Sequence, residues 1–230
     1  MTDITLLTQQ FYQRCMAVEN AAGSSELVKA NDVGWESIAV QNDGFKTASD
    51  LPWIDWKKAK SVLDVGCGYG DLLKFLSSNK LYTGEYHGID IMPNFIINAI
   101  LNCVGRYDSH FQTGNFLEQD WHDKQFEIVI SLGGIGVNYD YPEPNGKKSL
   151  EYAQKFIAKL VEVSSSAVSL YFPNIDNKRK EAHNLLAYHK ISEIESMISQ
   201  AGEDRLRNIT FVSYPTPKDS KTIAKIELSK

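Results

Sequence analysis

Short apolar runs alternate with helix-like patterns along most of the chain. Five runs have the length and composition of strands buried within a parallel sheet: 61–65, 86–91, 109–113, 126–132 and 167–172. Between these runs, apolar residues recur at three- and four-residue spacing, which is typical of helices that cover a sheet. The alternation predicts an α/β fold with crossover helices.

The predicted helices are amphipathic, and they cover about 71–78, 95–103, 150–161 and 191–201. Two further strands, 209–214 and 222–228, close the chain. The stretch that joins them is too short for a helix, so we expect the two strands to pair antiparallel. The prediction is a Rossmann-like, seven-stranded, mostly parallel sheet with helices on both faces and an antiparallel last strand.

The first 57 residues do not follow this alternation. They begin with a helical pattern at 6–20 and continue as irregular sequence through Trp35 and Trp53. We interpret 1–57 as an N-terminal helical lid or cap, to which Tyr12 and Trp35 contribute aromatic rings. Residues 58–230 then form the main domain.

Composition excludes several classes of protein. The chain of 230 residues has a net charge of −5, and its basic residues gather only in short clusters such as 178–180, so nucleic-acid binding is not expected. Three widely spaced cysteines form neither a disulfide framework nor a zinc motif. The N-terminus lacks a signal-peptide pattern, and no run approaches the roughly 20 apolar residues of a membrane span. We expect a soluble, cytoplasmic protein, and the sequence indicates no oligomeric state.

The first predicted strand ends in a glycine-rich turn. Gly66, Gly68 and Gly70 stand at alternate positions, where the missing Cβ lets the backbone approach a ligand closely. Ligands of open α/β sheets bind at this carboxyl end of the strands. Asp90 ends the second strand 20 residues after Gly70, and an acid at such a spacing accepts hydrogen bonds from a ribose diol.

The turn favours S-adenosylmethionine over a nicotinamide dinucleotide. The dinucleotide fingerprint G-x-G-x-x-G would need a third glycine where this chain has Asp71, or Leu73 if the motif starts at Gly68. An acid at the start of that helix would repel a pyrophosphate. S-adenosylmethionine has no pyrophosphate but carries an ammonium, a carboxylate and a sulfonium, and Asp64 before the turn suits the ammonium or its water shell.

The stretch 64–70, Asp-Val-Gly-Cys-Gly-Tyr-Gly, resembles the first motif of the class I S-adenosylmethionine-dependent methyltransferases. The resemblance implies that S-adenosylmethionine is the cofactor, that S-adenosylhomocysteine is the product, and that no metal is needed. Many members have Asp where Asn115 stands in the adenine-side loop, but Asn can also bond an adenine edge. The cofactor-binding residues that the motif and the resemblance together indicate are Asp64, Gly66, Cys67, Gly68 and Gly70 in the turn, Asp90 for the ribose, Ile91, Met92, Asn115 and Phe116 around the adenine, Ser131, Leu132 and Gly133 at the methionine half, and Trp35 over the cofactor.

Motifs of several methyltransferase subclasses are missing. The chain has no Asn-Pro-Pro-Tyr sequence after the fourth strand, no Pro-Cys nucleophile, and no carboxylate cluster able to hold magnesium beyond Asp140 and Glu143. We therefore expect a small-molecule acceptor, methylated on O or N. The candidates that orient or deprotonate it are Tyr139, Asp140, Tyr141 and His189 at the carboxyl edge. The tyrosines can equally pack their loop, and a lone His is often a core residue.

Three alternatives stay open at this point. A nicotinamide-dependent oxidoreductase would bind NAD. A non-catalytic S-adenosylmethionine-binding scaffold or sensor would bind the cofactor without turnover. A protein methyltransferase would label a protein rather than a metabolite.

Overall fold

The computed structural model describes residues 4–19, 30, 33–105, 107–121, 124–141, 143, 146–177, 185–216 and 220–229, with the backbone alone over 14–19. The basic cluster at 178–180 lies outside these residues. No helix in the described part of the chain combines the length and apolar composition needed to cross a membrane.

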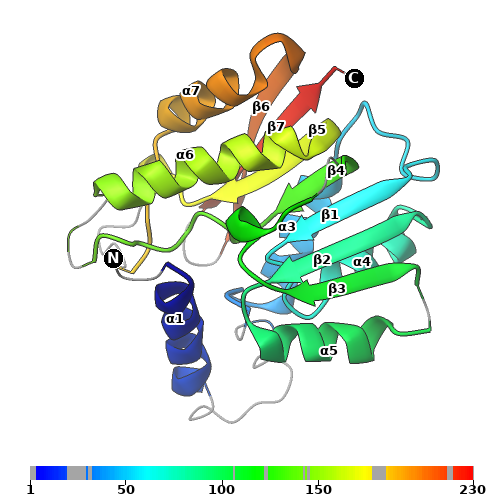
Figure 1. The fold of residues 1–230 in the computed structure, drawn as a ribbon, viewed down its shortest axis with the longest axis horizontal. Helices are drawn as coiled ribbons and strands as arrows, with labels where there is room; N and C mark the ends of the chain where they lie inside the picture. Colours follow the sequence, from blue (N-terminus) through cyan, green and yellow to red (C-terminus); the bar gives the residue numbers. More distant parts are fainter. Residues whose placement is uncertain are drawn as a thin grey trace.

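One seven-stranded sheet forms the centre of the molecule, in the strand order β3-β2-β1-β4-β5-β7-β6 (Figure 1). Its strands are β1 (Ser61–Val65), β2 (Glu85–Asp90), β3 (Ser109–Thr113), β4 (Phe126–Ser131), β5 (Ser164–Phe172), β6 (Leu206–Pro215) and β7 (Ser220–Leu228). β1 to β5 pair in parallel, and β7 runs antiparallel to both β5 and β6. The predicted seven-stranded, mostly parallel sheet with an antiparallel last strand is confirmed.

Helices cover both faces of the sheet, as predicted. They are α1 (Ile4–Glu19), α3 (Ile38–Ser49), α4 (Asp71–Asn79), α5 (Pro93–Cys103), α6 (Lys147–Glu162) and α7 (Ile191–Gly202). Two apolar clusters form the core: α6 and α7 pack on one face of the sheet, and α3 and α4 pack on the other, where α5 contributes Cys103. Side chains of β1 alternate between the two clusters, with Leu63 in the first and Val62 in the second.

The prediction of irregular sequence between the first helix and the sheet was wrong over α3. Its N-terminus is capped by Ser37, whose hydroxyl accepts the Val40 N–H at 3.2 Å. This helix is hard to predict from the sequence because its segment contains a glycine, Gly44, and few strong helix formers. Packing overrides that weakness: Phe45 contacts the ring of Trp35, and a Cβ at Gly44 would lie 2.6 Å from that ring.

α1 lies across the carboxyl edge of the sheet (Figure 1). The Gln9 side-chain amide donates to the Ile91 carbonyl at 3.0 Å, which joins α1 to the end of β2. The Thr8 hydroxyl is 3.0 Å from that of Tyr139, in the loop after β4. The N-terminal helix therefore covers the edge where ligands of such sheets bind.

Candidate cofactor and acceptor site

The turn after β1 presents bare backbone at the carboxyl edge. Gly66 and Gly68 have φ angles of 82° and 52°, in the left-handed region that favours glycine. The N–H groups of Gly66 and Cys67 donate to the Ile89 carbonyl at 2.8 and 3.2 Å, which ties the turn to β2. A Cβ at Gly66 would meet no protein atom within 4 Å. The turn thus leaves open space above the backbone of Gly66.

Asp90, at the end of β2, holds the turn with its carboxylate. One oxygen accepts the Gly68 N–H and the other accepts the Met92 N–H, each at 2.9 Å. Burial raises the pKa of Asp90 to about 6, although these backbone bonds oppose the rise. The Ile91 backbone also contributes a hydrogen bond to this carboxylate. Because a carboxylate has about four acceptor positions, about one remains for a ligand such as a diol.

Asp64, on β1, is a second buried acid next to the turn. Its side chain accepts a hydrogen bond from the Tyr86 hydroxyl. Burial raises the pKa of Asp64 to about 7, the hydrogen bond from Tyr86 opposes the rise, and the Asp90 charge adds to it. No cationic side chain that the structure describes pairs with Asp64 or Asp90. A cationic ligand beside them would favour their ionised forms.

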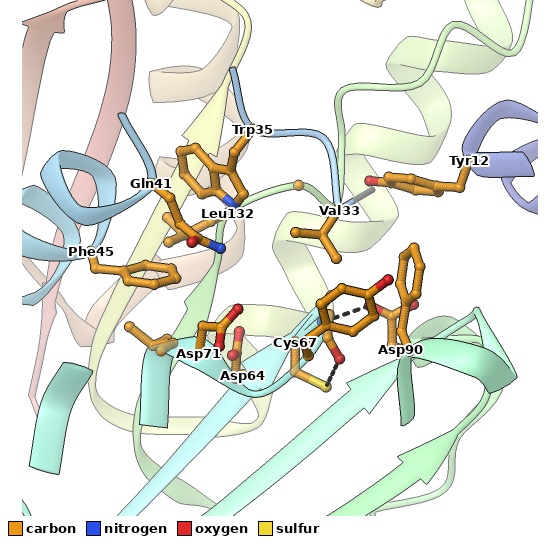
Figure 2. A pocket seen from close by; sticks show the side chains of 16 residues that line it. Tyr12, Val33, Trp35, Gln41, Phe45, Asp64, Cys67, Asp71, Asp90 and Leu132 are labelled. Atoms are coloured by element: carbon orange, nitrogen blue, oxygen red, sulfur yellow. Dashed lines mark hydrogen bonds between the residues drawn. The ribbon is translucent and has the colours of Figure 1, made fainter. Parts of the chain in front are cut away.

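These groups line a cavity with two lobes, which meet at Tyr12, Gly66, Asp90 and Gly133. Figure 2 shows the first lobe, between the glycine turn and α3. Among the predicted cofactor residues, the first lobe contains Asp64, Gly66, Cys67, Gly68, Asp90, Leu132, Gly133 and Trp35. The second lobe, towards β3, adds Ile91, Asn115 and Phe116. Residues far apart in the sequence thus line the two lobes together.

Three of the predicted cofactor residues support the cavity from behind. Gly70 is the N-cap residue of α4. Met92 is buried, and its N–H bonds Asp90. The Ser131 hydroxyl donates to the Val65 carbonyl at 2.9 Å, which fixes the end of β4 against β1. Their contacts position the residues that line the cavity.

α3 brings to the cavity residues that sequence reasoning missed. Gln41 and Phe45, one helical turn apart, both project into the first lobe, and the Gln41 amide points towards Asp64 and Asp71 (Figure 2). The missed signal was the Ser37 cap followed by this four-residue spacing. The first lobe therefore has aromatic walls and a carboxyl-rich floor.

The predicted acceptor residues lie apart from this lobe. Both oxygens of Asp140 accept from the start of α6: one from the Lys148 N–H at 3.1 Å, the other from the N–H and hydroxyl of Ser149 at 2.8 Å each. Burial is the largest single effect and raises the pKa of Asp140, but the hydrogen bonds from Ser149 and Lys148 together lower it on balance. Tyr139 is buried with its ring 4.7 Å from that of Tyr152. Its neighbour Tyr141 is 57% exposed.

His189, the fourth predicted acceptor residue, is inside the protein. Its side chain is almost fully buried, and its Nε2 lies 3.2 Å from the Ile135 carbonyl. Burial lowers the pKa of His189, so the ring is neutral at physiological pH. It lines neither lobe of the cavity.

The fold and the glycine turn agree with a known family. A family model described as a methyltransferase domain matches residues 56–213. The chain belongs to the class I S-adenosylmethionine-dependent methyltransferases.

Two curated relatives of this methyltransferase are plant enzymes. A probable tocopherol O-methyltransferase of Oryza sativa subsp. japonica is 39% identical over 79 residues, which cover 33% of this chain and 21% of the rice protein. Phosphoethanolamine N-methyltransferase 1 of Triticum aestivum is 25% identical over 171 residues, 72% of this chain and 34% of the wheat protein. The matches thus span about a fifth to a third of these relatives' length.

A solved structure shows the same fold over nearly the whole chain. The N-methyltransferase NodS of Bradyrhizobium japonicum, crystallised with S-adenosylhomocysteine, has a TM-score of 0.65 and 12% identity. The match covers 96% of this methyltransferase and 98% of NodS. The chain therefore shares the fold of NodS over nearly its whole length.

Proposed function

We propose that the chain binds S-adenosylmethionine in the two-lobed cavity and transfers its methyl group to an O or N atom of a small-molecule acceptor. The observation that carries this proposal is the pairing of a bare glycine turn with two buried carboxyls that have no described cationic partner. The rice and wheat relatives, named for O- and N-methylation of small molecules, support the acceptor class.

The residues of the cavity suit the cofactor part by part. Asp90 has an acceptor position left for the ribose diol. Asp64 lies in the first lobe, where a carboxylate would bind an ammonium or its water shell. The second lobe, with Ile91, Asn115 and Phe116, offers an apolar wall and an amide edge for the adenine. The open space above Gly66 leaves room for the cofactor to pass from one lobe to the other.

When bound, the cofactor supplies a methyl carbon activated by a sulfonium for in-line displacement. The chain's own residues then have to orient the acceptor and exclude water. We place the acceptor in the first lobe, against Trp35, Gln41 and Phe45, because these side chains form its outer wall. The Gln41 amide can orient a polar acceptor, and Asp71 below it favours one that carries a positive charge or a donor.

This placement assigns the predicted acceptor residues to supporting roles. Asp140 caps α6 with both oxygens, and His189 is enclosed within the protein. Tyr139 reaches the site through its hydroxyl contact with Thr8 on α1. Tyr141 is exposed, lines neither lobe, and is the most accessible of the four.

Thermal melting with separate ligands tests the cofactor. S-adenosylmethionine and S-adenosylhomocysteine should each raise the melting temperature, whereas NAD and ATP should not. A ligand at a hundredfold excess over its dissociation constant adds about 2.7 kcal/mol to the free energy of unfolding, which gives a clear shift. A shift with NAD alone, or with no ligand, would contradict the proposal.

Transfer of a radiolabelled methyl group tests the acceptor class. Label should move from S-adenosylmethionine into the small-molecule fraction of a metabolite extract. Label found only in protein would indicate a protein methyltransferase. Cofactor binding with no transfer to any fraction would indicate a scaffold or sensor.

A further inference from the structure

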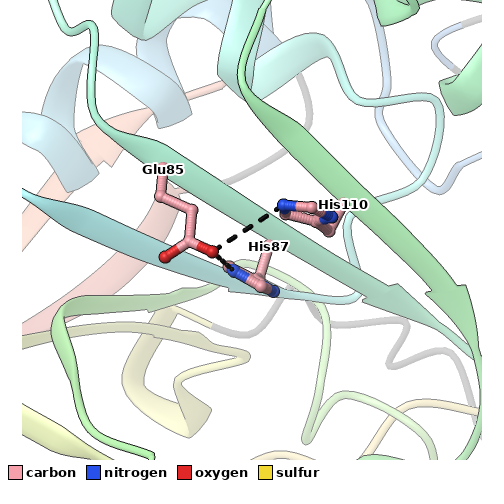
Figure 3. Close-up of side chains that lie close together, drawn as sticks. All are labelled: Glu85, His87 and His110. Atoms are coloured by element: carbon pink, nitrogen blue, oxygen red, sulfur yellow. Dashed lines mark ion pairs between the residues drawn. The ribbon is translucent and has the colours of Figure 1, made fainter.

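A cluster of potential metal ligands lies at the amino ends of β2 and β3, away from the cavity. Glu85 and His87 belong to β2, and His110 belongs to β3, directly beside His87 in the sheet register (Figure 3). The His87 Nε2 is 2.7 Å from Glu85 Oε1, and the His110 Nε2 is 3.7 Å from the same oxygen. All three ligand atoms lie within 4.8 Å of one another.

His87 is held rigidly in its position. Its ring lies between that of Phe126, at 5.0 Å, and that of His110, at 4.9 Å. Its Nε2 faces Glu85 Oε1 at 2.7 Å, and the neutral form of an imidazole is the one that binds a metal.

The Lys124 ammonium is a cation that already lies against this cluster. Its Nζ is 2.9 Å from the His87 Nε2 and 3.4 Å from Glu85 Oε1, the same oxygen that the Nε2 contacts at 2.7 Å. Because a carboxylate only accepts hydrogen bonds and an ammonium only donates them, the Nε2 can donate to Glu85 or accept from Lys124, but not both. A metal ion between the three ligand atoms would bind all of them at once, because each would then supply an electron pair.

We propose that Glu85, His87 and His110 bind a divalent cation of the zinc class, which displaces the Lys124 ammonium. In tetrahedral zinc sites, bonds of about 2.0–2.1 Å put neighbouring ligand atoms about 3.3 Å apart. The observed separations of 2.7 and 3.7 Å fall on either side of that value. Two imidazoles select zinc over magnesium, which prefers oxygen ligands.

The bound cation joins β2 to β3, the edge strand of the sheet. Asp108, whose Oδ1 is 3.9 Å from the His110 Nε2, is close enough to serve as a fourth ligand. On β2, Asp90 follows His87 by three residues, about 10 Å along a strand. The metal site is therefore separate from the cavity, and its test is independent of cofactor binding.

Calorimetric titration of the untagged full chain with Zn²⁺ tests the site. We expect saturable binding of one equivalent at micromolar concentrations, with no binding of Mg²⁺. The His110 side chain is 62% exposed, so His110→Ala should fold, and it should lower the zinc affinity at least about tenfold through loss of a ligand. Asp55→Asn, an exposed acid elsewhere on the surface, is the matched control and should bind zinc like the parent chain.

Lys124→Met distinguishes a metal site from a hydrogen-bonded cluster. Removing the competing ammonium should raise the zinc affinity several-fold, and Zn²⁺ should raise the melting temperature of this variant but not that of His110→Ala. The proposal would be overturned if zinc did not bind saturably. It would also be overturned if both His110→Ala and Lys124→Met left the zinc affinity unchanged, as they would if zinc bound through cysteines instead.

Discussion

Asp90 ends β2 and Asp140 lies in the loop after β4, and both accept hydrogen bonds from backbone N–H groups. Asp90 accepts such bonds from Gly68 and Met92 and is nearly buried, and its pKa is raised. Asp140 accepts three hydrogen bonds from the first turn of α6, and its pKa is lowered. An acid at this edge can bind a ligand when burial leaves it without enough hydrogen-bond partners in the protein. It stabilises the fold instead when the N–H groups of a helix terminus satisfy its carboxylate.

The same contrast extends to the surroundings of the two acids. Asp90 shares its cavity with a second buried acid, Asp64, and no described cation accompanies them. Asp140 contacts α6, whose N-terminal N–H groups need such an acceptor because Gly146 provides no side-chain cap. Four substitutions test this comparison.

Gly66→Val should have the largest effect. Its side chain would enter the open space of the cavity, and we expect cofactor affinity to fall by more than about a hundredfold, close to 2.7 kcal/mol. Calorimetry with S-adenosylhomocysteine measures the change. Gly105→Val is the matched control, because Gly105 also has a positive φ and open space but lies outside the cavity. Equal affinity in the two variants would show that the cavity is not the cofactor site.

Asp90→Ala should have the next largest effect. Loss of charge-assisted hydrogen bonds to the ribose should weaken cofactor binding by about 1.5–3 kcal/mol, and the Gly68 N–H would lose its acceptor. The same calorimetric titration measures this loss. Unaltered affinity would place the ribose elsewhere.

Asp64→Asn should change the pH dependence of the stability of the folded chain. The folded state holds the Asp64 proton up to about pH 7, whereas the ordinary value is 3.8, so the folded chain binds more protons between these values. This acid therefore lowers stability as pH rises from about 4 to about 7, and the substitution should flatten that decline in melting experiments. Cofactor affinity should rise roughly tenfold from pH 6 to pH 8 in the parent chain as the carboxyl ionises.

Asp71→Asn is the control for this experiment, because Asp71 lines the same lobe and forms an ion pair with Lys74. Its pH profile should follow that of the parent chain between pH 4 and pH 7. A parent chain whose melting temperature does not fall over this range would contradict the raised pKa of Asp64.

Asp140→Ala should have the smallest effect on ligand binding. Loss of the cap on α6 should lower the free energy of unfolding by about 1 kcal/mol, measured by urea denaturation. Cofactor affinity should stay unchanged, and methyl transfer should persist. A large loss of transfer at full cofactor affinity would return Asp140 to the acceptor site.

Local patterns in the sequence determined the sheet and its helices. Apolar runs and helical spacing are set by which face of each element is buried, so they indicated all seven strands and the antiparallel closing pair. The glycine turn and Asp90 were also visible, because a close backbone approach restricts the residue type at each position. Sequence reasoning missed α3, since its helical propensity is weak and its stability comes from packing against Trp35 and the sheet.

Only the tertiary structure separated residues of similar appearance. Asp90 and Asp140 are both acids at or beyond the carboxyl end of a strand, yet α6 satisfies Asp140 and the cavity encloses Asp90. Glu85, His87 and His110 meet because the register of β2 and β3 places the two histidines side by side. The physical reason is general. Burial and hydrogen-bond partners come from segments distant along the chain, and they determine whether a polar side chain is satisfied by the protein or left for a ligand.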